Sequence, residues 1–328
     1  MKELCLSGIQ PTNVIHIGNY IGALKQWAEI QNRYPCLFPI VDLHAITVPQ
    51  DPKMLRENIL NAASTYLATG IDVKRSRIFI QSEVTGHTEL GWILSTIVKM
   101  SELERMTQFK DKAKKRGENV GAGLFTYPAL MAADILLYGA TAVPVGEDQM
   151  QHLELARLLA RRFNTTFGQT FPIPEAFIQQ SGARIMSLND PASKMSKSSP
   201  APTYIALTDS DDVIRKKIMR AVTDSGSEIV YDPKTKPALA NLLTIYHHMT
   251  GAHLKDVQKE FIGKGYGDFK KALAEATIAH LAPIRAKIAE YRSDKGELNR
   301  ILDAGRDFAQ HMADATMKTV KEHVGLGR

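Results

Sequence analysis

Hydrophobic positions in the first half of the chain alternate between short continuous runs and helical spacing. The run at 36–44, CLFPIVDLH, is almost wholly apolar, which is typical of a strand covered on both faces. The run at 77–82, RIFIQS, has the same character, whereas Ile17, Ile21 and Leu24 recur at helical intervals. Strand and helix therefore alternate, which predicts an α/β fold with a parallel, doubly wound, Rossmann-like sheet.

Other segments extend this pattern. ELCLSG (3–8) is a first strand, and TAVPVGEDQ (141–149) passes from a strand into a helix. Asp51 followed by Pro52 predicts a helix start, because aspartate caps a helix and proline fits its first position. Gly70 is expected to end that helix.

The strand pattern stops after Pro202. Helical patterns then follow at 209–222, 236–249, 253–262 and 268–291, and a last helix is expected over about 298–322. The sequence therefore predicts an α/β domain over residues 1–200 and an all-helical region over 201–328.

The composition excludes several classes of protein. The chain has 328 residues, of which 44% are hydrophobic and 23% charged, as in ordinary globular proteins. No apolar run reaches the roughly 18 residues of a membrane helix, and the first residues carry no secretory or transit pattern. Cys5 and Cys36 form no CxxC pair, so we expect neither a disulfide framework nor a zinc site. We expect the protein to be cytoplasmic. The net charge of +6 mildly favours a polyanionic partner.

The segment GIQPTNVIHIGNYIGA (8–23) is the first candidate for chemistry. Gly8 lets the backbone bend after the strand, and His16 opens a helix whose N–H groups and dipole favour an anion. Gly18 and Gly22 leave one helix face bare, where a flat ring could lie. A nucleotide site fits these features, and so does a turn with glycines for close packing.

The segment SKMSKSSPAP (193–202) is the second candidate. Its composition suits a solvated linker, a phosphorylation site or a working loop. Lys194 and Lys197 could neutralise the charge that develops on a leaving pyrophosphate. Because this segment and the one around His16 flank the same predicted sheet, they could close on one triphosphate, which favours the working loop.

Together, HIGN (16–19) and KMSKS (194–198) resemble the two signature motifs of class I aminoacyl-tRNA synthetases. The resemblance narrows to bacterial-type tryptophanyl-tRNA synthetases, over essentially the whole chain, through GNYIGAL (18–24), VDLHAIT (41–47), ELERMTQFK (102–110), LMAADILLY (130–138), VPVGEDQ (143–149) and GARIMSL (182–188). It implies ATP-dependent attachment of L-tryptophan to tRNA(Trp) through an adenylate, with Mg²⁺ on the ATP phosphates and a homodimer.

Asp134 can also be interpreted without the resemblance. It has Leu130, Met131, Leu137 and Tyr138 on the same helix face, so its carboxylate lies on an apolar stripe. A buried carboxylate needs a donor. The indole N–H of tryptophan is a donor only, but an internal salt bridge or a helix cap would also suffice. The resemblance makes Asp134 the indole anchor.

His44 ends an apolar run, at the edge where doubly wound sheets bind ligands. The residues alone slightly favour a purely structural histidine, whereas the resemblance implies a place in the amino-acid pocket. Asp148 and Gln149 could simply cap a helix. By resemblance, Asp148 binds the ATP ribose, Gln149 and Tyr127 bind the substrate amino group, and Gln10 lies beside the substrate carboxylate and the phosphates.

The resemblance divides the candidate residues into three sets. The ATP set is Gln10, Gly18, Asn19, Gly146, Asp148, Ile185 and Met195. The tryptophan set is Gly8, His44, Tyr127, Met131, Asp134, Val143, Val145 and Gln149. The catalytic set is His16, Asn19, Lys112, Lys194 and Lys197, with no protein-bound metal expected. Lys112 would reach the triphosphate from the side opposite to the other two lysines.

The resemblance implies that the helical region over 201–328 binds the anticodon of the tRNA. The basic helix near Arg215, Lys216, Lys217 and Arg220 is then either an ordinary exposed surface or a contact for tRNA phosphates. Four residues depart from the common family pattern, namely Leu6 for an aromatic residue, His16 for threonine, Leu43 for glutamine and Met150 for lysine. None removes a group that the chemistry requires.

Three other functions share part of this pattern. A tyrosyl-tRNA synthetase would need partners for a phenolic hydroxyl, and a small-molecule nucleotidyltransferase would not need the large helical region. A catalytically silent relative would be expected to lose one or more of the lysines, yet all of them are present.

Overall fold

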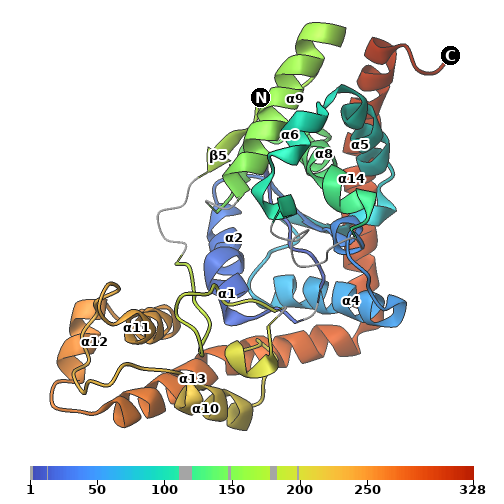
Figure 1. The fold of residues 1–328 in the computed structure, drawn as a ribbon. Helices are drawn as coiled ribbons and strands as arrows, with labels where there is room; N and C mark the ends of the chain where they lie inside the picture. The colour runs from blue at the N-terminus through green and yellow to red at the C-terminus, as the bar shows by residue number, and fades with distance from the viewer. Residues whose placement is uncertain (1–2, 13, 111–119, 147–148, 178–182, 198) are drawn as a thin grey trace.

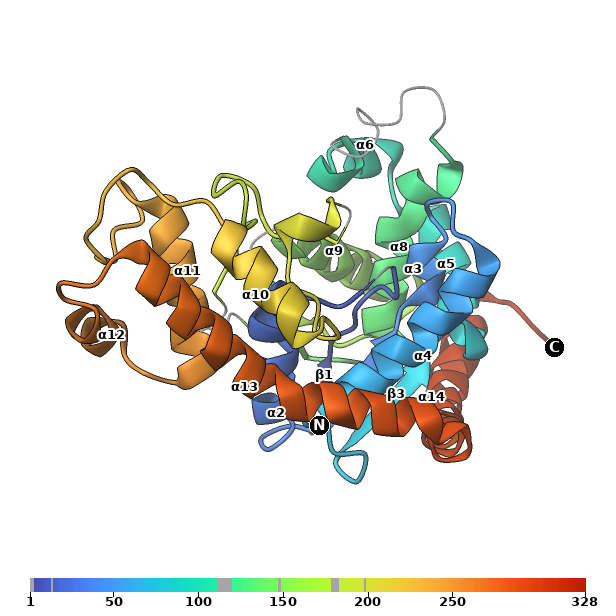
Figure 2. The same cartoon turned by 90° about the horizontal axis from the view of Figure 1, so that it is seen from below.

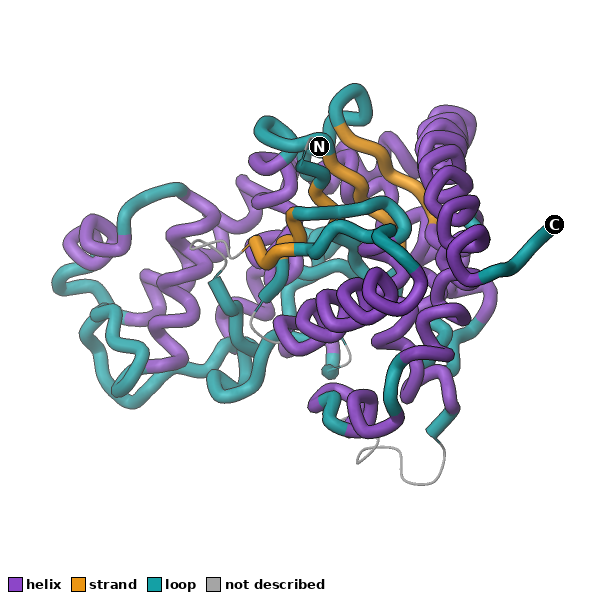
Figure 3. The backbone as a smooth tube through the Cα atoms, turned by 90° about the horizontal axis from the view of Figure 1, so that it is seen from above, coloured by secondary structure: helices purple, strands orange, loops and turns teal. Residues whose placement is uncertain are grey.

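A five-stranded parallel sheet forms the centre of the molecule. The computed structural model describes residues 3–12, 14–110, 120–146, 149–177, 183–197 and 199–328. The strand order is β3-β2-β1-β4-β5, all neighbours run parallel, and Figure 3 shows the strands between layers of helices. The strands are β1 (Cys5–Leu6), β2 (Cys36–Ile40), β3 (Ser76–Ile80), β4 (Ala142–Pro144) and β5 (Glu175–Phe177). The predicted doubly wound parallel sheet is confirmed.

Alternating strand residues face two separate cores. Phe38 and Ile78 join the core that includes the helices after β1 and β2, whereas Leu37 and Phe79 join the core on the other side. This alternation follows from the period of two in a strand, and both faces being covered explains the continuous apolar runs. The run predicted as one strand over 36–44 is a strand only to Ile40, because the chain turns there into a short helix.

The helices of the α/β part connect the strands and cover both faces of the sheet. On one side lie α1 (Ile17–Asn19), the π-helix η1 (Tyr20–Leu24), α2 (Lys25–Ile30) and α4 (Pro52–Ala68). On the other lie α5 (Gly86–Ile97), α6 (Met100–Glu104), α8 (Ala122–Leu136) and α9 (Met150–Phe167). The short α3 (Asp42–Ala45) and the 3₁₀-helix η2 (Gln81–Glu83) follow the carboxyl ends of β2 and β3.

Helix α4 begins and ends as its sequence predicts. The Asp51 carboxylate accepts the Met54 N–H at 2.8 Å, and Pro52 occupies the first helical position. Gly70 follows the helix with a φ of +105°, which a residue with a side chain rarely adopts.

The helices after residue 200 begin with a short 3₁₀-helix, η4 (Ala201–Thr203). The longer ones are α10 (Asp211–Arg220), α11 (Pro237–Thr250), α12 (Leu254–Glu260), α13 (Tyr266–Ser293) and α14 (Lys295–Val324). Figure 1 shows α10, α11 and α12 grouped away from the sheet. Figure 2 shows α13 running from that group along α4 toward α14. In the described part of the chain, no helix combines the length and the apolar character needed to cross a membrane.

The last helix returns to the sheet. In α14, Gly305 lies so close to β3 that an added Cβ would be 1.9 Å from the Ile78 carbonyl oxygen. Ala309 and Ala313 are fully buried in the same core as Phe79. The division of the chain at residue 200 stays a prediction, but α14 packs as part of the α/β layer and not with α10–α12.

Candidate active site

The helix after β1 begins with a histidine cap. His16 Nδ1 accepts the N–H groups of Gly18 at 3.1 Å and Asn19 at 3.4 Å, and Asn19 Oδ1 accepts the His16 N–H at 3.2 Å. A Cβ on Gly18 would lie 2.9 Å from the His16 ring, so glycine there gives the ring its space. The sequence predicts that the N–H groups at this helix start bind an anion. In the structure, those of Gly18 and Asn19 donate to His16 instead.

The loop of residues 194–197 packs directly against this helix start. Met195 is buried, and its N–H donates to the Ile185 carbonyl at 3.0 Å. Its Cβ lies 3.6 Å from the Cβ position of Gly18. The two motifs that were expected to close on one triphosphate are thus neighbours in space.

Two lysines of this loop act on His16. Burial, followed by the charges of Lys197 and then Lys194, lowers the pKa of His16 to about 4. The imidazole is therefore neutral near pH 7. Because Nδ1 accepts hydrogen bonds, the ring proton lies on Nε2.

Lys197 is the more enclosed of the two lysines. Its Nζ donates to the Gln10 carbonyl at 2.7 Å, which joins the loop to the segment after β1. Burial lowers the pKa of Lys197 to about 8. Lys194 is exposed beside it. Of the two ammonium groups, that of Lys194 is accessible to a triphosphate in solution, whereas that of Lys197 is partly buried.

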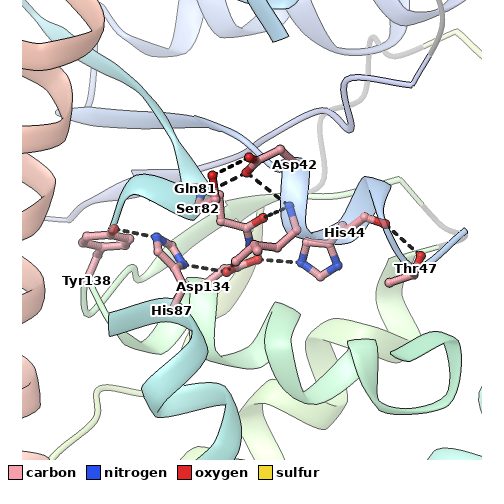
Figure 4. A network of polar contacts seen from close by, with 9 residues as sticks. Asp42, His44, Thr47, Gln81, Ser82, His87, Asp134 and Tyr138 are labelled. Atoms are coloured by element: carbon pink, nitrogen blue, oxygen red, sulfur yellow. Dashed lines mark hydrogen bonds and ion pairs between the residues drawn. The ribbon is translucent and has the colours of Figure 1, made fainter. Parts of the chain in front are cut away.

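Asp134 lies at the centre of a second cluster, shown in Figure 4. Its Oδ2 is 2.8 Å from His44 Nε2, and its Oδ1 is 2.7 Å from His87 Nδ1. Gln81 Nε2 donates to the same Oδ1 at 2.7 Å. Burial tends to raise the pKa of Asp134, but its interactions with His44 and His87 outweigh this effect and hold the pKa at about 2. The carboxylate is therefore ionised at neutral pH.

The donor that Asp134 needs is supplied from within the protein. His44 and Asp134 form the internal pair that the sequence left open as an alternative. Among the described residues, Oδ2 has His44 as its one hydrogen-bond partner and Oδ1 has two. A carboxylate oxygen can accept two hydrogen bonds, so Oδ2 retains capacity for a further donor. The role of Asp134 as an indole anchor stays a prediction.

The cluster extends in two directions from Asp134. Tyr138 OH lies 2.7 Å from His87 Nε2, and Gln81 Oε1 accepts the Leu43 N–H at 3.1 Å. Sequence reasoning did not single out Gln81 or His87. Gln81 directly follows β3 at the sheet edge where His44 follows β2, so the rule that identified His44 could have found it.

An apolar surface adjoins Asp134 and His44. Tyr127, Met131 and Asp134 recur at intervals of four and three along α8, which places them on one helix face. Val143 is buried and Met131 half-buried in the core that includes Leu6. Tyr127 OH lies 2.7 Å from His152 Nε2, and its ring meets that of His44 edge-on at 6.0 Å. These tryptophan-site candidates therefore lie together, with Val145 packed against the same core.

The remaining candidates are placed as follows. A Cβ on Gly8 would lie 2.6 Å from the Pro39 carbonyl oxygen, so glycine allows β1 and β2 to approach at their ends. Gln149 precedes α9, and its N–H donates to the Gly146 carbonyl at 2.9 Å. Lys112 and Asp148 lie outside the described residues.

Helix α10 has both paired and exposed cations. Arg215 Nε is 2.8 Å from Glu275, and Lys217 Nζ is 2.6 Å from Asp209, whereas Lys216 is exposed. Within the described ranges, no three His, Cys, Asp or Glu side chains are grouped so that they could hold a metal ion.

Comparison with known proteins gives one consistent result. Residues 2–282 match the family described as tRNA synthetases class I (W and Y). The chain is 51% identical over 329 aligned residues to the tryptophan–tRNA ligase of Halalkalibacterium halodurans, covering 100% of this chain and 99% of that protein.

Solved structures agree in fold. The tryptophanyl-tRNA synthetase of Mycoplasma pneumoniae superimposes with a TM-score of 0.92 at 37% identity, covering 100% of this chain and 99% of that one. The Campylobacter jejuni enzyme, complexed with ADP and tryptophan, gives a TM-score of 0.86 at 37% identity, covering 98% of this chain and 100% of that one.

Proposed function

Because this chain belongs to the bacterial tryptophan–tRNA ligases, within the class I tRNA synthetases, we propose that it attaches L-tryptophan to tRNA(Trp) at the expense of ATP. The reaction passes through tryptophanyl-adenylate and releases pyrophosphate and then AMP. The observation that supports it best is the packing of the Lys194–Lys197 loop on the His16 helix, at the sheet edge where His44 follows β2 and contacts Asp134 of α8.

In the first step the tryptophan carboxylate attacks the α-phosphate of ATP. The carboxylate is already ionised at neutral pH, so no general base is needed, and catalysis consists of alignment and charge stabilisation. Lys194 and Lys197, together with Lys112, hold the leaving pyrophosphate. Mg²⁺ bound to the ATP phosphates would neutralise part of their charge, and no residue of this chain is proposed as its ligand. His16, with its proton on Nε2, donates to a phosphate oxygen.

Tryptophan is recognised beside Asp134. The indole N–H donates to Oδ2, the oxygen with one hydrogen-bond partner among the described residues. Met131, Val143 and Val145 contact the ring, and Tyr127 and Gln149 bind the amino group. A site built around such a hydrogen bond rejects analogues that lack the donor, by about 10⁴–10⁵-fold in the best cases.

In the second step the 2′-hydroxyl of the terminal adenosine attacks the adenylate, and AMP leaves. The region from residue 201 onward, through the exposed cations of α10, contacts tRNA phosphates. The reaction takes place in the cytoplasm.

The chain works as a homodimer, and each tRNA lies across both subunits. Two large apolar side chains on consecutive helices support a self-association surface. Trp92 on α5 is 73% exposed and Met100 on α6 is 64% exposed. Sedimentation equilibrium at micromolar concentration tests this assembly: a dimer mass is expected, and a monomer mass would contradict it.

Charging of unfractionated bacterial tRNA with radiolabelled amino acids tests the complete reaction. Tryptophan should become acid-precipitable on tRNA in the presence of ATP, and removal of ATP should abolish this. Charging with tyrosine instead would move the specificity to the sister enzyme. No charging with any amino acid would indicate a silent relative.

A further inference from the structure

A row of polar side chains runs from Asp134 away from the expected substrate. Tyr138 OH, His87 and Asp134 Oδ1 follow one another with contacts of 2.7 Å each, as Figure 4 shows. His87 is fully buried and Tyr138 nearly so. Neither residue reaches the face of Asp134 that His44 occupies.

The direction of this row is determined by chemistry. The Asp134 carboxylate can only accept, so His87 Nδ1 must donate to it. Nε2 then accepts the hydrogen bond of the Tyr138 hydroxyl. Burial, and then the charge of Asp134, raises the pKa of Tyr138, so the hydroxyl remains a donor. One tautomer of His87 thus satisfies every contact.

Packing holds the row in place. The Phe79 ring lies 6.0 Å from that of His87 and 5.7 Å from that of Tyr138, measured between ring centroids. Phe79 is part of β3, so the His87 ring is held against the sheet. A rigid donor on Oδ1 limits rotation of the Asp134 carboxylate and so fixes where the lone pairs of Oδ2 point.

We propose that His87 and Tyr138 are positioning residues that aim Asp134 Oδ2 at the indole N–H and thereby set the selectivity for tryptophan. This inference rests on the proposed function. Neither residue touches the substrate, and both act through the orientation of one carboxylate. Gln81, the second donor on Oδ1, assists from the other direction.

The proposal makes a selectivity ratio the decisive quantity. A fold defect lowers the activation of all amino acids together, whereas a misaimed acceptor penalises only the substrate that uses it. The ratio compares kcat/KM for ATP–pyrophosphate exchange with tryptophan and with its benzothiophene analogue, in which sulfur replaces the indole N–H. We expect a high ratio for the unaltered protein.

Four variants test the row. His87→Leu removes the donor, and the ratio should fall by about 10- to 100-fold, the effect of one hydrogen bond to a charged group. Tyr138→Phe removes one hydroxyl and should lower the ratio by a smaller factor. His87→Asn retains an amide donor near the place of Nδ1 and should restore most of the ratio. Phe163→Leu, the matched control, removes a buried ring of the same core whose ring contacts are Phe167 and Phe171, and should retain the ratio.

The outcomes distinguish failure of the proposed function from failure of the positioning role. If the unaltered protein does not activate tryptophan, the proposed function fails. If it does, and folded His87→Leu keeps the original ratio, the positioning role is wrong. Should His87→Leu fail to fold, Tyr138→Phe decides alone: an unchanged ratio overturns the proposal, and a lowered ratio supports it.

Discussion

Lys197 Nζ donates a hydrogen bond to the Gln10 carbonyl at 2.7 Å, and so closes the loop after residue 193 onto the segment that follows β1. The ammonium is held by a backbone carbonyl in a place where a triphosphate is expected. An ATP phosphate can take over this donor and offers a full negative charge in exchange. The contact therefore holds the loop against the segment after β1, where the proposed function requires it.

Lys197→Ala should slow adenylate formation far more than it weakens tryptophan binding. Loss of one group that stabilises developing charge costs about 10²–10³ in rate. Pyrophosphate exchange measures the rate, and calorimetry with tryptophan measures the affinity. The exposed Lys53 of α4 supplies the control, since Lys53→Ala should leave both quantities unchanged. Equal losses of rate and affinity in Lys197→Ala would rule out charge stabilisation.

The activity should fall as the pH rises through about 8. Burial lowers the pKa of Lys197 to about 8, so the ammonium that holds pyrophosphate is lost above that pH. The profile of kcat/KM for ATP reports this group in the ligand-free protein. In Lys197→Arg the guanidinium stays charged, and the fall should move to higher pH. An unchanged fall in that variant would assign it to another group.

A loss of protein stability caused by deprotonation of Lys197 does not explain a fall in activity above pH 8. The pKa of Lys197 is about 8 in the folded protein and near its ordinary value of 10.5 when unfolded. Between these values the unfolded chain binds more protons, so the stability contributed by this group rises with pH. The free energy of unfolding, measured at pH 8 and at pH 9.5, should therefore not decline on account of Lys197.

Asp134→Asn should weaken the preference for tryptophan over phenylalanine by about 10- to 100-fold. The amide oxygen can remain with Gln81 and His87, while the amide NH₂ replaces Oδ2 and faces the indole N–H as a second donor. Exchange rates with the two amino acids measure the preference. Asp42→Asn is the matched control, because Asp42 is also a buried carboxylate but bonds to Ser82. Unchanged selectivity in Asp134→Asn would exclude it as the anchor.

Gly305→Ala should destabilise the protein by about 1–3 kcal/mol or more. A Cβ there would lie 1.9 Å from the Ile78 carbonyl oxygen, so α14 must move away from β3. The gain in helix propensity, about 1 kcal/mol, is not enough to compensate. Urea unfolding measures the change. Gly267→Ala on α13, with nothing within 4 Å of the added Cβ, should be neutral or stabilising. Equal stability of the two variants would contradict the tight packing of α14.

The sequence was sufficient to predict elements with strong periodicity. The helix after Asp51 and the long helices beyond residue 200 were predicted close to their true ends, because caps and apolar spacing are local signals. The strand β5 was missed, since Glu175–Phe177 is three residues long at the sheet edge and carries no alternation. The return of α14 to β3 was also missed, because a helix sequence shows an apolar stripe but not its partner.

The candidate site was predictable only in part. The motifs at His16 and Lys197 could be assigned to one site because their order along the sheet brings them together. The partners of Asp134 depend on contacts between α5, α8 and η2, which no local pattern encodes. A single histidine such as His87, at the start of an apolar helix, resembles any buried histidine until the structure shows what it touches.

ATP–pyrophosphate exchange with each of the twenty amino acids, in the absence of tRNA, tests the central claim most directly. If ATP activates the amino acid and Asp134 selects the indole N–H, exchange should be confined to tryptophan. Exchange with tyrosine in its place would retain the chemistry of the His16 and Lys197 segments but contradict the assignment of Asp134. Absence of exchange with every amino acid would contradict the proposed activation of tryptophan by ATP alone.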